Sequence, residues 1–147
     1  MTSQKLVLAA ADAEDLEALS ARLQDAVAQV KDLVYLPKSR RFAGLFNRFK
    51  WESAGGRSGA RVRAGLHIEG VLSARACKLR TDNPDAVASL LAIRFLPRGG
   101  EDPGGIIELV FSGGGILKLE VECIDAELAD LSGEWPARGQ PVHELEP

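Results

Sequence analysis

The chain is poor in the residue types that build catalytic and metal sites. It has two cysteines, Cys77 and Cys123, and two histidines, His67 and His143. Nucleophilic catalysis needs a nucleophile beside an oriented base, whereas we expect His67 on the polar face of a strand and His143 in the tail. The two cysteines show no paired spacing, so we expect two reduced, buried thiols; a single long-range disulfide is the alternative.

Metal, phosphate and membrane signals are also missing from the sequence. It contains no HExxH, CxxC, calcium-loop or G-x-S-x-G pattern. The glycines at 113–115 lack the Lys-Ser/Thr and helix of a phosphate loop, so they predict a hairpin turn; the SAGGRSGA segment at 53–60 is either an anion-binding nest or, more simply, a flexible linker. The apolar run at 6–11 is too short for a signal peptide, and no run approaches the ~20 residues of a membrane span. We therefore predict no catalytic residue, cofactor or metal, and a cytoplasmic protein.

Charge is the feature that stands out. Residues 1–37 carry three basic and six acidic residues, residues 38–98 thirteen and four, and residues 99–147 two and eleven. The formal net charge of −3 is thus the sum of a basic middle block and an acidic C-terminal block that nearly cancel. A chain of this length is expected to bury one core without metals or disulfides.

The N-terminal part predicts a short apolar strand at 5–10, followed by an amphipathic helix. Asp12 is a candidate N-cap, because a carboxylate there accepts a hydrogen bond from the first turn. The helix is expected to run for four to five turns. Its apolar stripe recurs at spacings of three and four: Leu16, Leu19, Leu23, Val27 and Val30.

The remainder reads mostly as antiparallel strands. Alternation is clearest at 61–69, Gly70 predicts a bend or bulge, and 71–79 continues as strand. The other expected strands are 33–36, ended by a turn at 37–40, and 42–51, 90–96, 106–111 and 116–123, with Leu117, Leu119, Val121 and Cys123 facing inward. We expect Asp125 to cap a short helix ending near Leu131.

These elements predict an α+β fold: an N-terminal strand and amphipathic helix, then about seven mostly antiparallel strands and a short C-terminal helix. A pleckstrin-homology-like barrel plugged by that last helix is one topology with this order, and a flatter sheet covered by the first helix is the alternative. Residues 1–135 are expected to form a single domain, and 136–147 a frayed tail.

The basic block offers the one candidate binding surface. Its cations are interleaved with the aromatic residues Phe42, Phe46, Phe49 and Trp51, as in proteins that bind single-stranded nucleic acid. The candidate residues for an anion or a partner are Arg40, Arg41, Arg48, Lys50, Arg61 and Arg63. The acidic block, including Lys118, Glu120 and Glu122 on one strand face, offers internal ion pairs instead.

Three segments carry a resemblance to a known family: LVYLPKSRRFAGLFNRFKWE, LLAIRFLP and, most specifically, GGIIELVFSGGGILKLEVECIDAELADL. Together they resemble a small bacterial family of unknown function whose genes often neighbour that of histidinol dehydrogenase. The resemblance spans about residues 5–135. It implies a complete, single-domain cytoplasmic protein and assigns no site residue.

Three functional hypotheses follow. We favour a non-enzymatic interaction module that docks a protein partner or a second copy of itself, because catalytic constellations are missing and the charge blocks are segregated. The alternative is a module for an anionic ligand, namely RNA, single-stranded DNA or acidic lipid. An enzyme of unrecognised type is the third.

Overall fold

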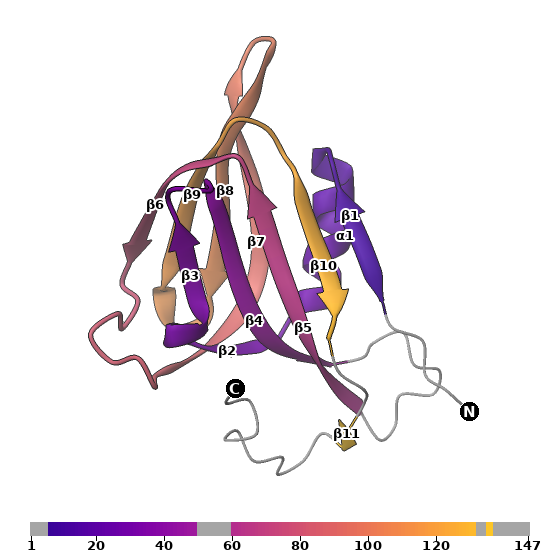
Figure 1. Ribbon diagram of the computed structural model, residues 1–147, viewed down its shortest axis with the longest axis vertical. Coiled ribbons are helices and arrows are strands. Elements are labelled where there is room, and N and C mark those ends of the chain that lie inside the picture. The colour runs from indigo at the N-terminus through magenta and orange to yellow at the C-terminus, as the bar shows by residue number, and fades with distance from the viewer. Residues whose placement is uncertain (1–5, 50–59, 132–134, 137–147) are drawn as a thin grey trace.

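The computed structural model describes residues 6–49, 60–131 and 135–136 of the chain. Eleven strands among these residues join one sheet, and one α-helix, α1 (Ala13–Leu23), packs against it (Figure 1). The strands are β1 (Val7–Ala10), β2 (Val27–Gln29), β3 (Leu33–Leu36), β4 (Arg41–Phe49), β5 (Ala60–Glu69), β6 (Val71–Cys77), β7 (Val87–Gly99), β8 (Asp102–Phe111), β9 (Ile116–Val121), β10 (Ala126–Asp130) and β11 (Trp135–Pro136). The predicted α+β class with an antiparallel sheet is confirmed.

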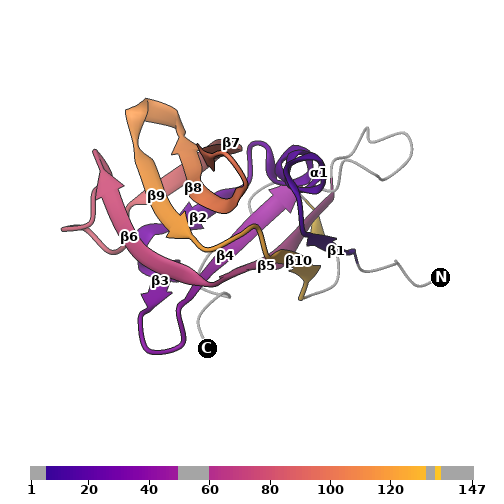
Figure 2. The ribbon, with the colours of Figure 1, turned by 90° about the horizontal axis from the view of Figure 1, so that it is seen from above.

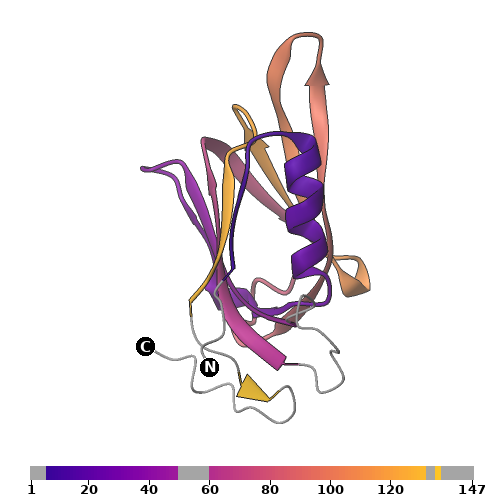
Figure 3. The ribbon, with the colours of Figure 1, turned by 90° about the vertical axis from the view of Figure 1, so that its right-hand side faces the viewer.

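The sheet is open and strongly curved. Its strand order is β1-β10-β5-β4-β2-β7-β8-β9-β6, with β3 added on β4 and β11 on β5. The two halves turn toward each other, and α1 lies between β1 and β7 (Figure 2). The β7–β8 hairpin extends beyond the other strands (Figure 3). The curvature brings β6, the last strand of the order, close to β3.

A bend at Gly70 divides one long stretch of chain between the two halves. Gly70 has a φ of +67°, a conformation that glycine adopts without steric cost. The Val71 N–H donates to the Arg40 carbonyl (2.8 Å), and the Glu122 N–H donates to the Gly70 carbonyl (3.0 Å). Before the bend the chain pairs with β4 and β10, and after it with β9. The predicted bend is confirmed.

The core lies between the inner faces of the two halves. Alternate residues of each strand are buried there, as the period of two requires. In β4 the buried positions are Phe42, Gly44, Phe46 and Arg48, while the residues between them are half-buried on the outer face. Arg48 is thus a charged side chain at a core position, and it needs a partner.

The helix begins as predicted but ends earlier. The Asp12 side chain accepts a hydrogen bond from the Asp15 N–H (2.8 Å), which confirms the N-cap. The helix ends at Leu23, because Asp25 adopts a left-handed φ of +68° and its N–H donates to the Leu90 carbonyl (2.8 Å). Val27 therefore lies on β2, and its helical spacing from the residues before it is coincidental.

The predicted C-terminal helix is wrong. Residues 126–130 form β10, which fills the place between β1 and β5. Ala126, Leu128 and Asp130 alternate inward, and the Asp125 carbonyl accepts the Glu69 N–H (2.9 Å). A short alternating segment fits both the pattern of a capped helix and that of a strand. Here the segment forms a strand because it pairs with a neighbouring strand on each side. The helix expected to plug a pleckstrin-homology-like barrel is therefore not formed by these residues.

Most of the other strands agree with the sequence. The strands at 33–36 and 106–111, the turn at 37–40, the hairpin turn at 113–115 and the preference for a strand at 90–96 are confirmed. Leu117, Leu119 and Val121 face inward, but Cys123 is exposed because β9 ends at Val121. The expected burial of Cys123 is thus wrong.

The N-cap gives a direct test of the helix. We expect Asp12→Ala to lower the free energy of unfolding by about 1 kcal/mol, since the first turn loses its side-chain acceptor. Urea denaturation measures this change. The control is Glu17→Ala, an exposed position within α1 where alanine is a good helix former, and we expect little change. Equal losses in both variants would show that the cap contributes nothing.

Candidate functional site

Ion pairs within the fold join the basic middle block to the acidic C-terminal block and neutralise part of the charge of each. Within the described parts of the chain, five such pairs join the basic middle block to the acidic C-terminal block: Arg40–Glu122 (2.7 Å), Arg48–Asp130 (2.9 Å), Arg94–Glu108 (2.8 Å), Arg98–Asp102 (2.8 Å) and Arg98–Glu120 (3.1 Å). Glu120 and Glu122 form ion pairs with the basic block, as predicted, whereas Lys118 forms none among the described residues. The blocks therefore cancel in part within one fold.

The predicted binding residues lie in different surroundings. Arg40 and Arg41 are exposed and pair with Glu122 and Glu69. Arg48 is fully buried, whereas Arg61 and Arg63 are half-buried on the outer face of β5. Lys50 lies outside the described residues. The structure thus brings Arg48 to the opposite face of the sheet from Arg61 and Arg63, so these six do not form one surface.

Arg48 and Asp130 form the buried polar centre of this half of the sheet. Their side chains are 0% and 2% exposed, and the guanidinium donates from Nε to Oδ1 (2.9 Å) and from Nη2 to Oδ2 (3.0 Å). Oδ2 also accepts the Leu6 N–H (2.9 Å), which ties β10 to the start of the described chain. A two-point pair of this kind is strong and directional, and both groups are satisfied. It holds strands together and is closed to ligands.

Arg61 is stacked rather than free on the surface. Its guanidinium carbon lies 4.3 Å from the centre of the Phe49 ring, and Nη1 donates to the Asn47 carbonyl (3.3 Å). Burial lowers the pKa of Arg61, an effect that the charge of Asp25 opposes. The cation–π contact and the hydrogen bond hold this side chain against the outer face of the sheet, so its role there is structural.

The groups with catalytic potential do not converge. His67 is exposed on β5, as predicted, and His143 lies outside the described residues. Cys77 is half-buried and Cys123 exposed, and both are free thiols. Among the described residues no three His, Cys, Asp or Glu side chains are arranged to hold a metal ion. The described helices include none long and apolar enough to cross a bilayer.

A cleft of about 460 Å³ lies between α1 and β7. Its polar lining consists of Glu14 and Glu17, which are exposed, and Arg94, whose Nη2 donates to Glu108 (2.8 Å). The Ser20 hydroxyl accepts the Ile93 N–H (2.8 Å), so the helix already covers part of the β7 edge here. The one cation in the lining of this cleft, Arg94, is therefore already paired with a carboxylate.

A second, apolar opening lies where the sheet fails to close. Among the described strands β3 pairs with β4 alone and β6 with β9 alone, so each presents one unpaired edge. The two edges face each other and run in opposite directions (Figure 1). No backbone hydrogen bond joins the described residues of these two edges. We name this opening, with its two edges, the β3–β6 groove.

The floor of the groove is apolar. The Tyr35 hydroxyl of β3 donates to the Val71 carbonyl at the start of β6 (2.8 Å), so the two strands are in contact there. A cavity of about 80 Å³ lies between the strands. Its lining residues are Val30, Leu33, Tyr35, Phe42, Ala74, Ala76, Leu79, Thr81 and Leu117.

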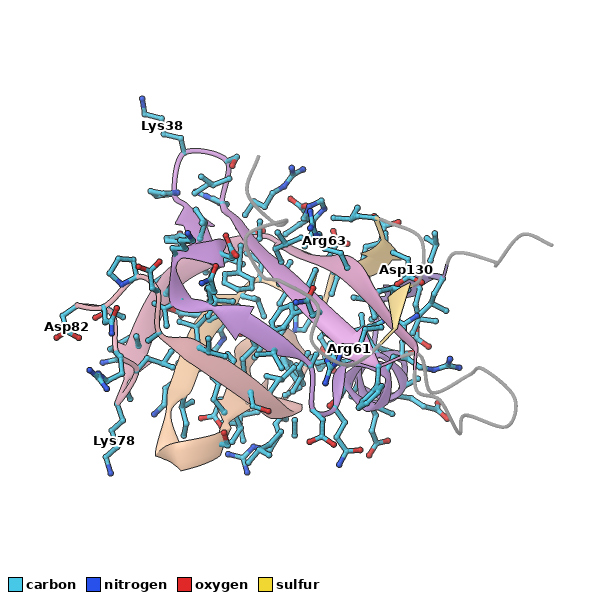
Figure 4. All side chains as sticks on the ribbon, turned by 90° about the horizontal axis from the view of Figure 1, so that it is seen from below. Lys38, Arg61, Arg63, Lys78, Asp82 and Asp130 are labelled. Atoms are coloured by element: carbon cyan, nitrogen blue, oxygen red, sulfur yellow. The ribbon has the colours of Figure 1, made fainter. Side chains whose placement is uncertain are left out.

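Positive charge lies along the β6 side of the groove. Arg75, Lys78 and Arg80 are exposed and make no ion pair among the described residues, and Asp82 is the acid that follows them along the chain. Lys78 and Asp82 both project into solvent on the side of the molecule away from Arg61, Arg63 and Asp130 (Figure 4). Lys78 also adopts a left-handed φ of +60°, which is sterically costly for a residue with a Cβ. The chain keeps a lysine where glycine is less strained.

Sequence reasoning did not identify the β3–β6 groove. Arg75, Lys78 and Arg80 stood among the basic residues, but nothing in the order of residues showed which strands lack neighbours. Edge strands arise from long-range pairing, and the alternation at 71–77 is the same for an edge as for a central strand. The two small residues Ala74 and Ala76, on one face of the predicted strand, were the one weak signal of an open groove.

Comparison with known proteins places the chain in a family. A family model described as "Protein of unknown function (DUF2948)" matches residues 6–143, so the chain belongs to that family. This confirms the predicted membership of a family of unknown function, while the gene neighbourhood stays a prediction. No curated protein and no solved structure matches the chain.

The buried pair generates a stability prediction. We expect Asp130→Ala to lower the free energy of unfolding by about 3–5 kcal/mol, because it leaves the Arg48 guanidinium buried without its carboxylate. The double variant Arg48→Met/Asp130→Leu should recover most of this loss. Chemical denaturation measures all three proteins.

The exposed pair Arg40–Glu122 provides the control. We expect Arg40→Ala to cost at most about 1 kcal/mol, since both side chains are largely in water. A loss in Asp130→Ala no greater than in Arg40→Ala would contradict a structural role for the buried pair.

Proposed function

We propose that the chain is a protein-interaction module that binds an extended segment of another protein in the β3–β6 groove by strand addition. The observation that carries the proposal is the pair of unpaired strand edges facing each other across an apolar floor. An extended peptide satisfies such an edge through main-chain hydrogen bonds, and its alternate side chains enter the groove. The 80 Å³ cavity offers room for one such side chain.

The charge of the β6 edge supports a different protein as the occupant. A twofold pairing of two β6 edges brings Arg75 and Lys78 of one copy near the same cations of the other, and like charges on paired strands repel. The internal pairing of the two charge blocks also removes the reason for head-to-tail association. A different protein with acidic side chains is not repelled by these cations, and its binding does not depend on head-to-tail association.

An anionic ligand is the weaker alternative for the six residues named from the sequence. Arg40, Arg41 and Arg48 already have carboxylate partners, so phosphates compete with existing ion pairs there. An enzyme has less support still, since the described His and Cys side chains do not converge in a cleft. A cytoplasmic location and a pleckstrin-homology-like arrangement of the strands remain predictions, and binding does not depend on either.

Filling the groove tests the proposal. We expect Ala74→Leu to occupy the apolar cavity, to hold or raise the free energy of unfolding by about 1 kcal/mol, and to abolish peptide binding. The probe is a random peptide library displayed on phage and selected on the immobilised full chain. Recovered peptides should bind the wild type and fail to bind the variant.

Ala9→Leu, an equal enlargement at an exposed β1 position, is the matched control and should leave binding unchanged. If no sequence is enriched on the wild type, or if enriched peptides bind Ala74→Leu as tightly as the wild type, the proposal fails.

Self-association gives a second test. We expect the chain to elute as a monomer in size-exclusion chromatography at both low and high salt, because the cations at the β6 edge oppose pairing of two copies. A dimer at low salt that dissociates at high salt would instead favour a second copy as the occupant.

A further inference from the structure

A row of charged residues, aligned by the strand register, crosses β7, β8, β9 and β6, and Glu108 within it is buried. The register places Arg94 opposite Glu108, Glu108 opposite Lys118, and Lys118 opposite Arg75. The signs along this row are therefore plus, minus, plus and plus. Arg94 and Glu108 form a hydrogen-bonded ion pair (2.8 Å), so the row is balanced at its β7 end.

The imbalance lies at the β6 edge. Arg75 faces the like charge of Lys118, and neither makes an ion pair among the described residues. Like charges directly opposite each other on paired strands are unfavourable. On its other side Arg75 meets the unpaired edge of β6. A strand added there places one of its own side chains directly beside Arg75, and a carboxylate at that position restores the alternation of signs.

The pleat of β6 determines the rest of the pattern. Ala74 and Ala76 line the groove, and they share the inner face with their register partners Leu119 and Leu117. Arg75 lies between them on the outer face. Because successive residues of a strand face opposite sides, an added strand presents one set of side chains to the apolar floor and the other set to the row of cations.

Lys78 extends the positive edge beyond the end of β6. It is exposed, and its left-handed backbone is retained despite the steric cost. Positions held against strain occur often where a side chain serves binding. Lys78 lies three residues after Arg75 and beyond the end of β6. A bound segment therefore reaches Lys78 only where it continues past the residues that pair with β6.

We propose that the segment bound in the β3–β6 groove alternates apolar and acidic residues, and that it adds to β6 with a carboxylate beside Arg75 and a further acidic residue beyond the end of β6, where Lys78 lies. This inference rests on the proposed function and specifies its ligand. The apolar residues provide burial, and the carboxylates provide selection among extended segments. The basic edge also discourages pairing between copies of this chain, so one feature both admits a partner and prevents self-association.

Two short synthetic peptides test the inference, one alternating valine with glutamate and one alternating valine with lysine. Fluorescence anisotropy with the full chain measures their affinities. We expect the glutamate peptide to bind about tenfold more tightly, the combined effect of two partly exposed ion pairs, with a smaller preference at high salt. In the double variant Arg75→Glu/Lys78→Glu the preference should reverse.

The variants carry their own controls. Arg75→Glu replaces the like-charged pair with Lys118 by an opposite one, so its thermal midpoint should rise and a loss of binding cannot be attributed to unfolding. Lys38→Glu makes the same change in net charge as Arg75→Glu alone, at the β3–β4 turn and at a distance from Lys78 (Figure 4), and should keep the preference.

The outcomes separate the inference from the proposed function. Equal binding of both peptides, lost in Ala74→Leu, overturns the acidic preference and leaves strand addition standing. Failure of both peptides, together with a failed library selection, overturns both. Single-stranded polyuridylate is the rival probe: if it displaces the glutamate peptide and binds more tightly, the edge is a nucleic-acid surface and the inference is wrong. Unchanged preference in the charge-reversed variant also refutes it, leaving the cations as protection of an edge strand.

Discussion

The bend at Gly70 is the constraint on which the rest of the structure depends. It lets one continuous stretch of chain pair with β4 and β10 on one side and with β9 on the other, which no straight strand can do. The two halves of the sheet therefore face each other and enclose a core. Because the hydrogen bonds from Val71 and to Gly70 hold this corner, β6 leaves it with one edge unpaired beside β3. The groove is a direct consequence of that turn.

Electrostatics operate at two levels in this fold. The buried Arg48–Asp130 pair and the outer pairs of Arg94 and Arg98 use acidic side chains from the C-terminal block to neutralise the basic one. Among the described residues, Arg75, Lys78 and Arg80 make no ion pair, and they lie on β6 or just beyond its end. Net charge and charge per segment therefore describe the surface poorly, since the ion pairs join residues that lie far apart in sequence.

Local patterns predicted local structure well. The capping carboxylate of Asp12, the alternation through β5 and the glycine at the bend each act within a few residues, so the order of residues reveals them. Two predictions were wrong where one stretch of sequence fits two local patterns equally well. Residues 126–130 satisfied a short helix until β1 and β5 supplied partners on both sides, and Val27 continued a helical spacing that Asp25 interrupts. In each case backbone pairing with a distant strand outweighed local propensity.

The candidate site shows the same division. The sequence alone determined an α+β chain with a charge partition and with no recognisable catalytic motif, because composition and periodicity carry that information. Only the tertiary structure decided which cations are paired, that Arg48 is buried, and that Arg75 lies at an open edge beside Lys118. The reason is physical: an unpaired edge and a neutralised charge are relations between strands, and backbone hydrogen bonds formed across long sequence separations set those relations.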